Sequence, residues 1–458
     1  MILPNDFLSE MKNIFNESDY DLFLKHYNDH CFKGLRVNTL KINPEKFKKI
    51  FEYKLKVSPF CENGFYIDEN VEKLGKHPLH HAGAFYLQEP SASFAVTVLA
   101  PKPYDKILDL CAAPGGKTTQ IAEKLKGTGL IWANEFIKNR TSSLISNIER
   151  LGIKNAVVSS CSTDIICKKL AGFFDKVLVD APCSGEGMFR KNPKAILEWS
   201  KEYVKSCTTR QLEILENAKY ALKKDGFLVY STCTFSLEEN EDVIRKFLEK
   251  NKNFELCEIK TNLARPAICS PQSSALNLNF AKRITPIENG EGHFFAKLQK
   301  KFLSDEDLSL KEALPYKYRK EEKTIFNAQK LYSELFNSSI YGNLEKFRDY
   351  YFILPQSLPD LKGLNVLRAG VLFCEDKKTY TIPCHAAFMA AKHEEINQKI
   401  NFNLNSKEIR SFLKGEELKV DSDLKGFVAV LVENMTVGFG KISNGKLKNK
   451  YPKGLRNN

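Results

Sequence analysis

Two cysteines stand where apolar runs typical of buried strands come to an end, and they are the first candidates for chemistry. Cys183 follows Pro182 in "VDAPCSG" (179–185), and Cys233 follows "VYST" (229–232). A thiol is either a small apolar filler or, as a thiolate, a strong nucleophile. Which of these applies depends on whether the two cysteines share one site, and therefore on the elements that carry them.

The elements around the cysteines have the pattern of a parallel α/β sheet, in which short apolar runs alternate with amphipathic helices. Residues 194–223 are predicted as a long helical stretch between the strands that precede the two cysteines. A right-handed crossover makes such strands parallel and adjacent. Because ligands bind at the carboxyl ends of the strands, both thiols are expected over one crevice. The predicted strands are "KILDL" (106–110), "LIWANE" (130–135), "AVVSS" (156–160), "KVLVD" (176–180) and "GFLVYS" (226–231).

A turn of small residues follows the first predicted strand, in "ILDLCAAPGGKTTQIA" (107–122), and leads into a helix from Lys117. Small residues let a ligand approach the backbone and the start of the helix. Glu135 stands twenty residues beyond Gly115, where an acid bonds ribose hydroxyls in nucleoside sites. The turn lacks the GxGxxG spacing, so S-adenosylmethionine, which has no pyrophosphate, fits better than NAD. The alternative is an ordinary strand–turn–helix connection.

A thiol beside a methyl donor points to a particular acceptor. Nitrogen and oxygen acceptors are already nucleophilic and need only positioning and a base. Carbon 5 of a pyrimidine is not, and it becomes enamine-like only when a thiolate adds at carbon 6. Asp180 is a candidate to hold the edge of the base or to move protons, and Lys117 to stabilise nearby negative charge.

Composition limits the class of protein. A chain of 458 residues is expected to form two or three domains, and its net charge of +13 favours a polyanionic partner. No apolar run is long enough to span a bilayer, and the start "MILPNDFLSEMKN" does not resemble a secretory signal, so a cytoplasmic location without membrane contact is expected. The twelve cysteines contain no CxxC pair, which argues against a metal site and against a disulfide framework.

Four regions are predicted along the chain. Residues 1–100 combine short helices with one strand, "GLRVNTLKI" (34–42), and residues 101–300 form the α/β domain. Residues 301–330 are strongly charged and are predicted as a linker. Residues 331–458 contain short strand-like runs separated by Gly and Pro, which is typical of a small, mostly β domain.

Several motifs together resemble the NOL1/NOP2/Sun family of RNA cytosine-5 methyltransferases: "CAAPGGKT", "DAPCSGEGMFRK", "YSTCTFSLEENE" and "GEGHFFA". The segments "HHAGAFYLQEPSA" (80–92), "VLRAG" (366–370) and "LKNKYPKGLR" (447–456) resemble its bacterial 16S ribosomal RNA methyltransferase F branch. The resemblance covers nearly the whole chain. It implies a Rossmann-like class I methyltransferase core, an N-terminal α+β RNA-binding subdomain and a mostly β, PUA-like C-terminal domain that binds RNA.

The resemblance also implies residue roles. Cys233 is the nucleophile that attacks carbon 6, Cys183 assists release from the methylated RNA, and Asp180 lies between donor and base. Glu135 binds the ribose of the donor, with Arg140 close by, and Asp164 corresponds loosely to a contact with the adenine. The remaining donor-site residues that it implies are Cys111, Ala112, Ala113, Pro114, Gly115, Gly116 and Lys117.

Candidate RNA contacts come from charge and from the resemblance. Arg190 and Lys191 follow the loop of Cys183 and are candidates for phosphate contacts, and Arg36 and Asn38 resemble positions that shape the family's RNA-facing surface. The alternative for each is solvated charge. The final eighteen residues are basic, and Tyr451 among them suits base stacking, although a frayed tail is the alternative. The candidate lysines there are Lys448, Lys450 and Lys453, and four histidines without metal spacing are interpreted as structural or RNA-facing: His80, His81, His293 and His385.

The resulting prediction is an S-adenosylmethionine-dependent RNA cytosine-5 methyltransferase that acts on ribosomal RNA, 16S rRNA or the small subunit, and holds no metal. The same chemistry on transfer RNA is the first alternative. A non-catalytic RNA-binding factor of ribosome assembly is the second, and the presence of both cysteines, Asp180 and the donor turn disfavours it. A nicotinamide-dependent dehydrogenase is a distant third.

Overall fold

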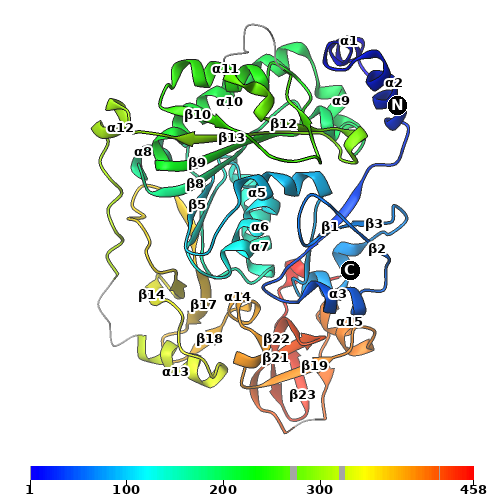
Figure 1. Ribbon diagram of the computed structural model, residues 1–458. Coiled ribbons are helices and arrows are strands. Elements are labelled where there is room, and N and C mark those ends of the chain that lie inside the picture. The colour runs from blue at the N-terminus through cyan, green and yellow to red at the C-terminus, as the bar shows by residue number, and fades with distance from the viewer. Residues whose placement is uncertain (1, 269–275, 319–324, 422, 458) are drawn as a thin grey trace.

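The computed structural model describes residues 2–268, 276–318, 325–421 and 423–457. Figure 1 shows a central sheet flanked by helices, an N-terminal part on one side and two small sheets of the C-terminal part below it. Both termini lie on the side of the N-terminal part.

In the part of the chain that the structure describes, the central sheet is built from ten strands: β5 (Lys106–Asp109), β6 (Leu130–Asn134), β7 (Ala156–Ser159), β8 (Phe174–Asp180), β9 (Leu222–Thr232), β10 (Phe254–Cys257), β11 (Arg265–Pro266), β12 (Lys282–Ile284), β13 (His293–Lys300) and β16 (Val366–Ala369). Their order is β11-β12-β13-β9-β8-β5-β6-β7-β16, with β10 paired to β13. Strands β7, β6, β5, β8 and β9 run parallel. From β5 the chain adds β6 and β7 on one side and then β8 and β9 on the other, so the strand order changes direction between β5 and β8. Parallel sheets of this kind bind ligands at that point.

The predicted strands of this domain are confirmed within a few residues at each end. β8 and β9 are parallel neighbours, and Asp180 is aligned with Ser231 at their carboxyl ends. The predicted crossover is present as α9 (Lys194–Glu198) and α10 (Lys201–Ala221), which are separated because Ser200 caps the second helix through Tyr203 N, at 3.1 Å. A capping serine favours a helix start, so one predicted helix becomes two.

Alternation along the strands places side chains on two faces, and each face is covered by helices. Leu108 and Trp132 pack in the same core as α8 (Thr163–Lys169), α10 and α11 (Glu241–Lys250). Ile107 and Ile131 point the other way, into the core formed with α5 (Phe94–Leu99), α6 (Gly116–Leu125) and α7 (Lys138–Arg150). Both faces are therefore buried, as a parallel sheet requires.

Among the described residues up to 90, the N-terminal part contains the helices α1 (Asn5–Ile14), α2 (Glu17–His26), α3 (Pro44–Ile50) and α4 (Pro78–His81) and the strands β1 (Lys33–Val37), β2 (Leu55–Val57), β3 (Gly64–Ile67) and β4 (Phe85–Leu87). The strands form an antiparallel sheet of order β2-β3-β1-β4. The strand predicted over 34–42 ends at Val37, because the buried Asn38 amide donates to the carbonyls of Gly83 and Leu151 and turns the chain. Asn38 is thus a structural residue that ties this part to the core.

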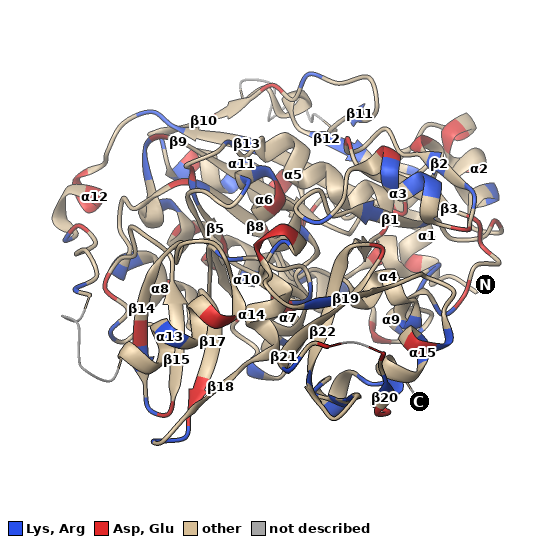
Figure 2. Cartoon of the chain, turned by 90° about the horizontal axis from the view of Figure 1, so that it is seen from below, with Lys and Arg blue, Asp and Glu red and all other residues tan. Residues whose placement is uncertain are grey.

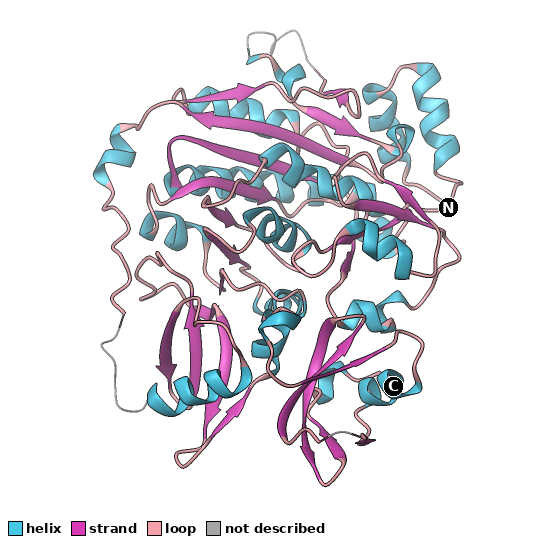
Figure 3. Ribbon diagram, turned by 60° about the horizontal axis from the view of Figure 1, so that its bottom comes forward, coloured by secondary structure: helices cyan, strands magenta, loops and turns pink. Residues whose placement is uncertain are grey.

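The described residues of the C-terminal part, from 325 on, form the helices α13 (Ile325–Leu335), α14 (His385–Ala390) and α15 (Lys407–Lys414) and two sheets. The first sheet holds β14 (Asn343–Phe347), β15 (Tyr350–Leu354), β17 (Val371–Asp376) and β18 (Thr381–Pro383), and the second holds β19 (Lys399–Phe402), β20 (Leu418–Lys419), β21 (Gly426–Val432), β22 (Met435–Ser443) and β23 (Lys446–Asn449). Figure 3 shows these two sheets side by side below the core. The "VLRAG" segment differs from the prediction for 331–458, because β16 joins the central sheet at the edge of β7. Arg368 fixes it there through an ion pair of 2.8 Å with Glu149 of α7.

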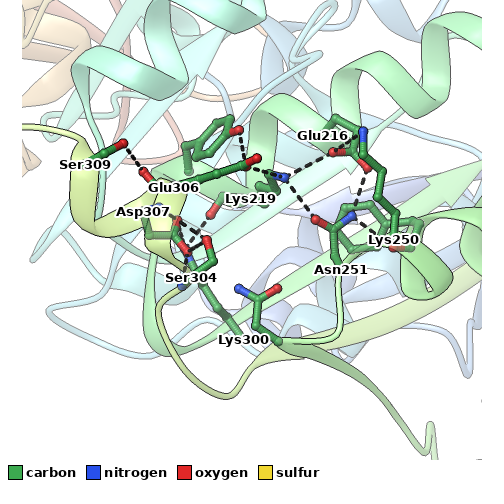
Figure 4. Close-up of polar contacts among 12 residues, drawn as sticks. Glu216, Lys219, Lys250, Asn251, Lys300, Ser304, Glu306, Asp307 and Ser309 are labelled. Carbon is green, nitrogen blue, oxygen red and sulfur yellow. Dashed lines mark hydrogen bonds and ion pairs between the residues drawn. The ribbon is translucent and has the colours of Figure 1, made fainter.

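The charged segment predicted as a linker, residues 301–330, is held against the core along its first part (Figure 4). The buried Lys300 ammonium donates to Asp307 of α12 (Asp305–Ser309) at 2.6 Å, and Lys219 lies 3.1 Å from Glu306. The acids of α12 therefore pair with lysines of β13 and α10, and this part of the segment is not a solvated tether. Residues 319–324 lie outside the described residues, and α13 begins at Ile325, before the predicted boundary.

Candidate active site

The two cysteine thiols lie together at the carboxyl edge of the sheet. Cys183 and Cys233 each stand just beyond the end of their strands, β8 and β9, and their Sγ atoms are 3.3 Å apart. The hydrogen bond with Cys233, together with burial, raises the pKa of the Cys183 thiol well above its usual value. Cys183 is therefore held as a protonated thiol, able to donate to its neighbour.

A buried carboxylate, Glu239, connects the segments that carry the two thiols. Its oxygens accept from the backbone N–H of Ser184 at 2.9 Å, from the Ser184 hydroxyl, and from Gln211 Nε2 at 2.8 Å. The Ser184 hydroxyl also lies 2.8 Å from that of Thr234. The residue after each cysteine is thus tied to one anchor, and burial raises the pKa of Glu239.

A second buried carboxylate, Glu186, also connects the segment of Cys183 to the segment of Cys233. It accepts from Trp199 Nε1 and from the backbone N–H of Phe235, both at 2.9 Å. Burial, with the nearby Glu239, raises the pKa of Glu186 to about 7. Sequence reasoning missed both acids, and their only signal was a glutamate placed directly beside each cysteine motif, in "CSGEGM" and "FSLEENE".

An ion pair lies at the carboxyl end of β8, beside β5, where the strand order changes direction. Lys117 Nζ, from the first turn of α6, is 2.6 Å from Asp180 Oδ2, and the Ser231 hydroxyl donates to Asp180 Oδ1 at 2.7 Å. Burial lowers the pKa of Lys117, but Asp180 outweighs it and holds that pKa above its usual value. Both predicted residues are thus brought to the crevice, with Lys117 as an ammonium. Ser231 was not predicted.

The predicted donor turn lies between β5 and α6. Its Ala113–Pro114 peptide bond is cis, and Gly115 has a φ of 108°, a conformation that side chains rarely adopt. Thr118 of α6 donates to Asp109 Oδ2 at 2.6 Å. The other oxygen of Asp109 is buried without a partner among the described residues, and burial raises the pKa of Asp109 to about 7. Asp109 was not predicted, although it ends the strand that leads into the turn.

Glu135, buried at the end of β6, braces the same turn. Its carboxylate accepts from Ile137 N at 2.9 Å and from Ala113 N at 3.3 Å. Arg140 lies 3.5 Å from Glu135 and donates to the carbonyl of Ala113 at 2.8 Å. The structure thus brings these predicted donor residues together. Asp164 is exposed in the first turn of α8, where its bond with Ser162 lowers its pKa, and its contact with adenine stays a prediction.

Two of the predicted RNA contacts are wrong for this conformation, because the side chains are buried in ion pairs. Arg36 is 3% exposed, pairs with Glu123 and donates to Thr119 at 2.8 Å. Arg190 is also 3% exposed and lies 2.9 Å from Glu291. Neither guanidinium is available to a phosphate. Arg36 joins the N-terminal part to Glu123 of α6, and Arg190 joins the core to the N-terminal part by donating to the carbonyls of His26 and His30.

The remaining RNA candidates are at the surface. Lys191 is exposed, and so are the three tail lysines, Lys448, Lys450 and Lys453. The tail itself is not frayed, because β23 pairs with β22 and Tyr451 is buried with its hydroxyl 2.7 Å from His81 Nδ1. Tyr451 is therefore unavailable for base stacking. Figure 2 shows lysines and arginines interspersed with acidic residues over this end of the molecule.

Among the described residues, no group of three or more His, Cys, Asp or Glu side chains could hold a metal ion. In the same part of the chain, no helix has the length and apolar character that a membrane crossing needs.

Comparison with known families matches three segments. The model described as 16S rRNA methyltransferase RsmB/F matches residues 96–299. The N-terminal domain of 16S rRNA methyltransferase RsmF matches residues 3–90, and the methyltransferase RsmF PUA domain matches residues 399–457. The predicted fold class, a Rossmann-like methyltransferase core between an N-terminal subdomain and a PUA-like C-terminal domain, is confirmed.

Individual proteins and structures agree. Ribosomal RNA small subunit methyltransferase F of Vibrio vulnificus (strain YJ016) is 32% identical over 466 residues, covering 99% of this chain and 97% of that protein. Its namesake from Vibrio cholerae serotype O1 (strain M66-2) is 33% identical over 473 residues, with the same coverage. A methyltransferase homolog from Pyrococcus horikoshii has a TM-score of 0.58 at 30% identity, covering 65% of this chain and 95% of that one. NSun6 from Pyrococcus horikoshii has a TM-score of 0.57 at 26% identity, covering 66% and 99%.

The predicted resemblance is therefore confirmed over nearly the full length of the chain, and the protein belongs to the family of the ribosomal RNA small subunit methyltransferase F.

Proposed function

We propose that this protein is an S-adenosylmethionine-dependent methyltransferase that forms 5-methylcytosine in the 16S RNA of the small ribosomal subunit. The observation that carries the proposal is the pair of thiols 3.3 Å apart beside the Lys117–Asp180 ion pair. Carbon 5 of cytosine needs covalent activation, and a thiol pair at a donor site suits that need. The names of the relatives supply the small-subunit RNA.

The turn after β5 fits the methyl donor. Gly115, with its positive φ, lets the backbone turn sharply at the start of α6. The unpartnered oxygen of Asp109 and the carboxylate of Glu135 can accept hydrogen bonds from a nucleoside ligand. When bound, S-adenosylmethionine supplies an electrophilic methyl group. The residues that we assign to its site are Asp109, Cys111, Ala112, Ala113, Pro114, Gly115, Gly116, Lys117, Glu135, Arg140, Asp164 and Asp180.

We assign the covalent step to Cys233. Its thiolate forms a bond to carbon 6, and the electron pair of the carbon 5–carbon 6 double bond makes carbon 5 nucleophilic. Carbon 5 takes the methyl group and then gives its proton to a base at the crevice, Asp180 or water, so that the double bond forms again while the carbon–sulfur bond breaks. The Lys117 ammonium stabilises negative charge that develops on the ring, and Asp180 keeps that ammonium in place.

We assign the assistance of release to Cys183. As the carbon–sulfur bond breaks, its electron pair returns to Cys233 as a thiolate. The protonated Cys183, with its sulfur 3.3 Å away, can donate a hydrogen bond to that thiolate and so make it a better leaving group. Glu186 and Glu239 act on both cysteines as positioning residues, because each contacts the segments of both.

The partner is RNA, and an enzyme that modifies ribosomal RNA acts in the cytoplasm, where ribosomes are assembled. The proposal is tested by bisulfite sequencing of total RNA from a deletion strain and from the same strain complemented with this gene. One cytosine of 16S rRNA should lose its methylation on deletion and regain it on complementation. If the lost methylation lies in transfer RNA, the substrate assignment is wrong. If no cytosine changes although the purified protein binds RNA, the non-catalytic alternative holds.

A further inference from the structure

A histidine with no assigned role lies beside the cysteines. His293 is the first residue of β13, which runs antiparallel to β9 with Phe294 opposite Thr232, so His293 lies at the same sheet edge as Cys233. Gly292, before it, has a φ of 146°, and a Cβ there would come within 2.9 Å of Gly187 Cα. The "GEGH" turn is thus pressed against the loop of Cys183.

Two residues of the N-terminal part orient the His293 ring. The Ser91 hydroxyl lies 3.0 Å from His293 Nδ1 and donates to Glu89 Oε2 at 2.6 Å. Burial raises the pKa of Glu89, but both of its oxygens are used as acceptors, because they also take the backbone N–H groups of Ser91 and Ala92, each at 2.9 Å. The single proton of the serine is therefore used on Glu89, so Nδ1 must be the donor to Ser91. The neutral ring then carries its proton on Nδ1 and a bare lone pair on Nε2.

The surroundings keep the ring neutral and on the donor side of the sheet. Burial, with the charge of Lys117, lowers the pKa of His293 to about 3. The ring stacks on Phe295 at 5.8 Å, and Phe295 is paired with Ser231, whose hydroxyl bonds Asp180. Within the described residues, Nε2 has no hydrogen-bond partner, and the side chain is 4% exposed. His293 thus holds an unused acceptor in a ring that is fixed next to the strand end of Ser231 and Asp180.

We propose that His293 recognises the target nucleotide, with Nε2 accepting a hydrogen bond from one of its N–H or O–H groups, and that Glu89 and Ser91 are positioning residues that keep this nitrogen unprotonated. The inference rests on the proposed function. The available donors on a target cytidine are the 4-amino group and the ribose 2′-hydroxyl. Uracil carries a carbonyl in place of the 4-amino group, so an acceptor at that point would also reject uracil.

A matched pair of variants separates the acceptor from the packing of the ring. In His293→Gln the amide oxygen can take the place of Nε2, whereas in His293→Asn the shorter amide reaches only Ser91 and leaves no acceptor. On 16S rRNA we expect His293→Asn to lower kcat/KM by about 3- to 10-fold, the range for one neutral hydrogen bond. His293→Gln should recover most of that loss. Both should bind S-adenosylmethionine as the wild-type enzyme does.

Nucleotide analogues identify the donor group. Two synthetic RNA segments carry, at the target position, either 2′-deoxycytidine or the pyrimidin-2-one ribonucleoside, which lacks the 4-amino group. The penalty of His293→Asn should disappear on the analogue that lacks the group bonded to Nε2. A penalty that persists in full on both analogues overturns the proposal, and so does a His293→Asn enzyme as active as the wild type. A wild-type enzyme that methylates no RNA would overturn the proposed function itself.

Glu89→Gln tests the positioning without touching the ring. The amide can donate to Ser91, so the serine can turn its proton toward Nδ1 and the histidine proton moves to Nε2. Nitrogen-15 spectra of histidine-labelled protein should show Nε2 unprotonated in the wild type and protonated in the variant. The variant should lose kcat/KM as His293→Asn does, at unchanged donor affinity. A protonated Nε2 in the wild-type protein would contradict the proposal, even if the variants failed to fold.

Discussion

Partly buried lysines lie at both edges of the central sheet, and they differ in what they contact. At the carboxyl edge, Lys117 is 2.6 Å from Asp180, which holds its pKa above the usual value although burial lowers it. At the amino edge, Lys41 donates to the carbonyl of Met389. Burial, with the charge of Lys154, lowers the pKa of Lys41 to about 7. The charge of Asp180 outweighs burial at Lys117, whereas at Lys41 burial and Lys154 outweigh the opposite charge of Glu395.

The cleft around Lys41 is large enough to hold a ligand. It measures about 820 Å³ and lies between Lys41, the start of β7 and the turn before β22. Yet its ionisable groups are not arranged around a nucleophile, whereas the crevice at the carboxyl edge brings two thiols and an ion pair together. The volume of a cleft therefore does not identify the active site of this protein, whereas the Lys117–Asp180 ion pair beside the two thiols does. Substitutions at the two edges should accordingly separate activity from stability.

The largest effect is expected for Cys233→Ala. Without the thiolate, carbon 5 is not activated, so methyl transfer to 16S rRNA should fall to background. The measurement is transfer of a labelled methyl group, with a denaturing gel to detect protein–RNA adducts. No adduct should form, and donor binding should be intact. Residual turnover above background would refute the covalent role.

Cys183→Ala should give a different defect. Cys233 can still attack, but the departing thiolate loses its hydrogen-bond donor at 3.3 Å. Turnover should become very slow, and a protein–RNA species that survives denaturing electrophoresis should accumulate. Accumulation of the adduct with Cys233→Ala, and its absence with Cys183→Ala, would mean that the two roles are exchanged.

Asp180→Asn should lower kcat/KM by about 10²- to 10³-fold, because Lys117 loses the carboxylate that fixes it for charge stabilisation. A matched control lies at the other end of the same strand. Asp175 of β8 accepts from Lys106 N at 2.7 Å and from Lys223 at 2.6 Å, at the amino edge of the sheet and thus at the opposite end of β8 from the thiols. Asp175→Asn should leave kcat/KM unchanged and affect only the thermal midpoint. Equal losses of kcat/KM in Asp180→Asn and Asp175→Asn would show that the carboxyl edge of the sheet is no more important for activity than the amino edge.

Glu135→Ala should weaken donor binding by about 10- to 100-fold, the range expected when a charge-assisted hydrogen bond is lost. RNA affinity should be nearly unchanged, since Glu135 braces the donor turn and not the thiols. Calorimetry with S-adenosylmethionine and filter binding with RNA measure the two separately. Parallel loss of both affinities would indicate a disturbed fold.

The parts that sequence predicted are those set by short-range rules. Apolar runs marked the strands, and the crossover rule placed β8 beside β9 with both cysteines at one edge. The donor turn was predicted for the same reason. Its glycines, Lys117 and Glu135 stand at the spacings that a strand–turn–helix unit with a following strand requires.

The parts that sequence missed depend on partners far along the chain. Arg36 pairs with Glu123, 87 residues away, and Arg190 with Glu291, 101 residues away, so nothing local showed that these charges are buried. The strand β16 was misplaced in the same way, because its partner β7 lies about 200 residues earlier and strand pairing at that range has no local signal.

The smallest effect, and one of opposite sign, is expected at the amino edge. The pKa of Lys41 is about 7 in the folded protein and 10.5 ordinarily, so the unfolded chain binds more protons between these values. Stability should therefore rise with pH from about 7 to 10.5. Lys41→Met should remove this dependence and raise the free energy of unfolding at pH 7 by on the order of a few kcal/mol at most, with kcat/KM unchanged.

The exposed Lys46, which lines the same cleft, provides the control, because Lys46→Met should change neither quantity. Thermal midpoints of the three proteins between pH 7 and pH 10 measure the difference. A Lys41→Met protein that is less stable than the wild type at pH 7 would show that the hydrogen bond to Met389 outweighs the cost of the buried charge. Lys41 would then stabilise the fold, as the paired Lys117 is expected to do, and the contrast between the two lysines would be wrong.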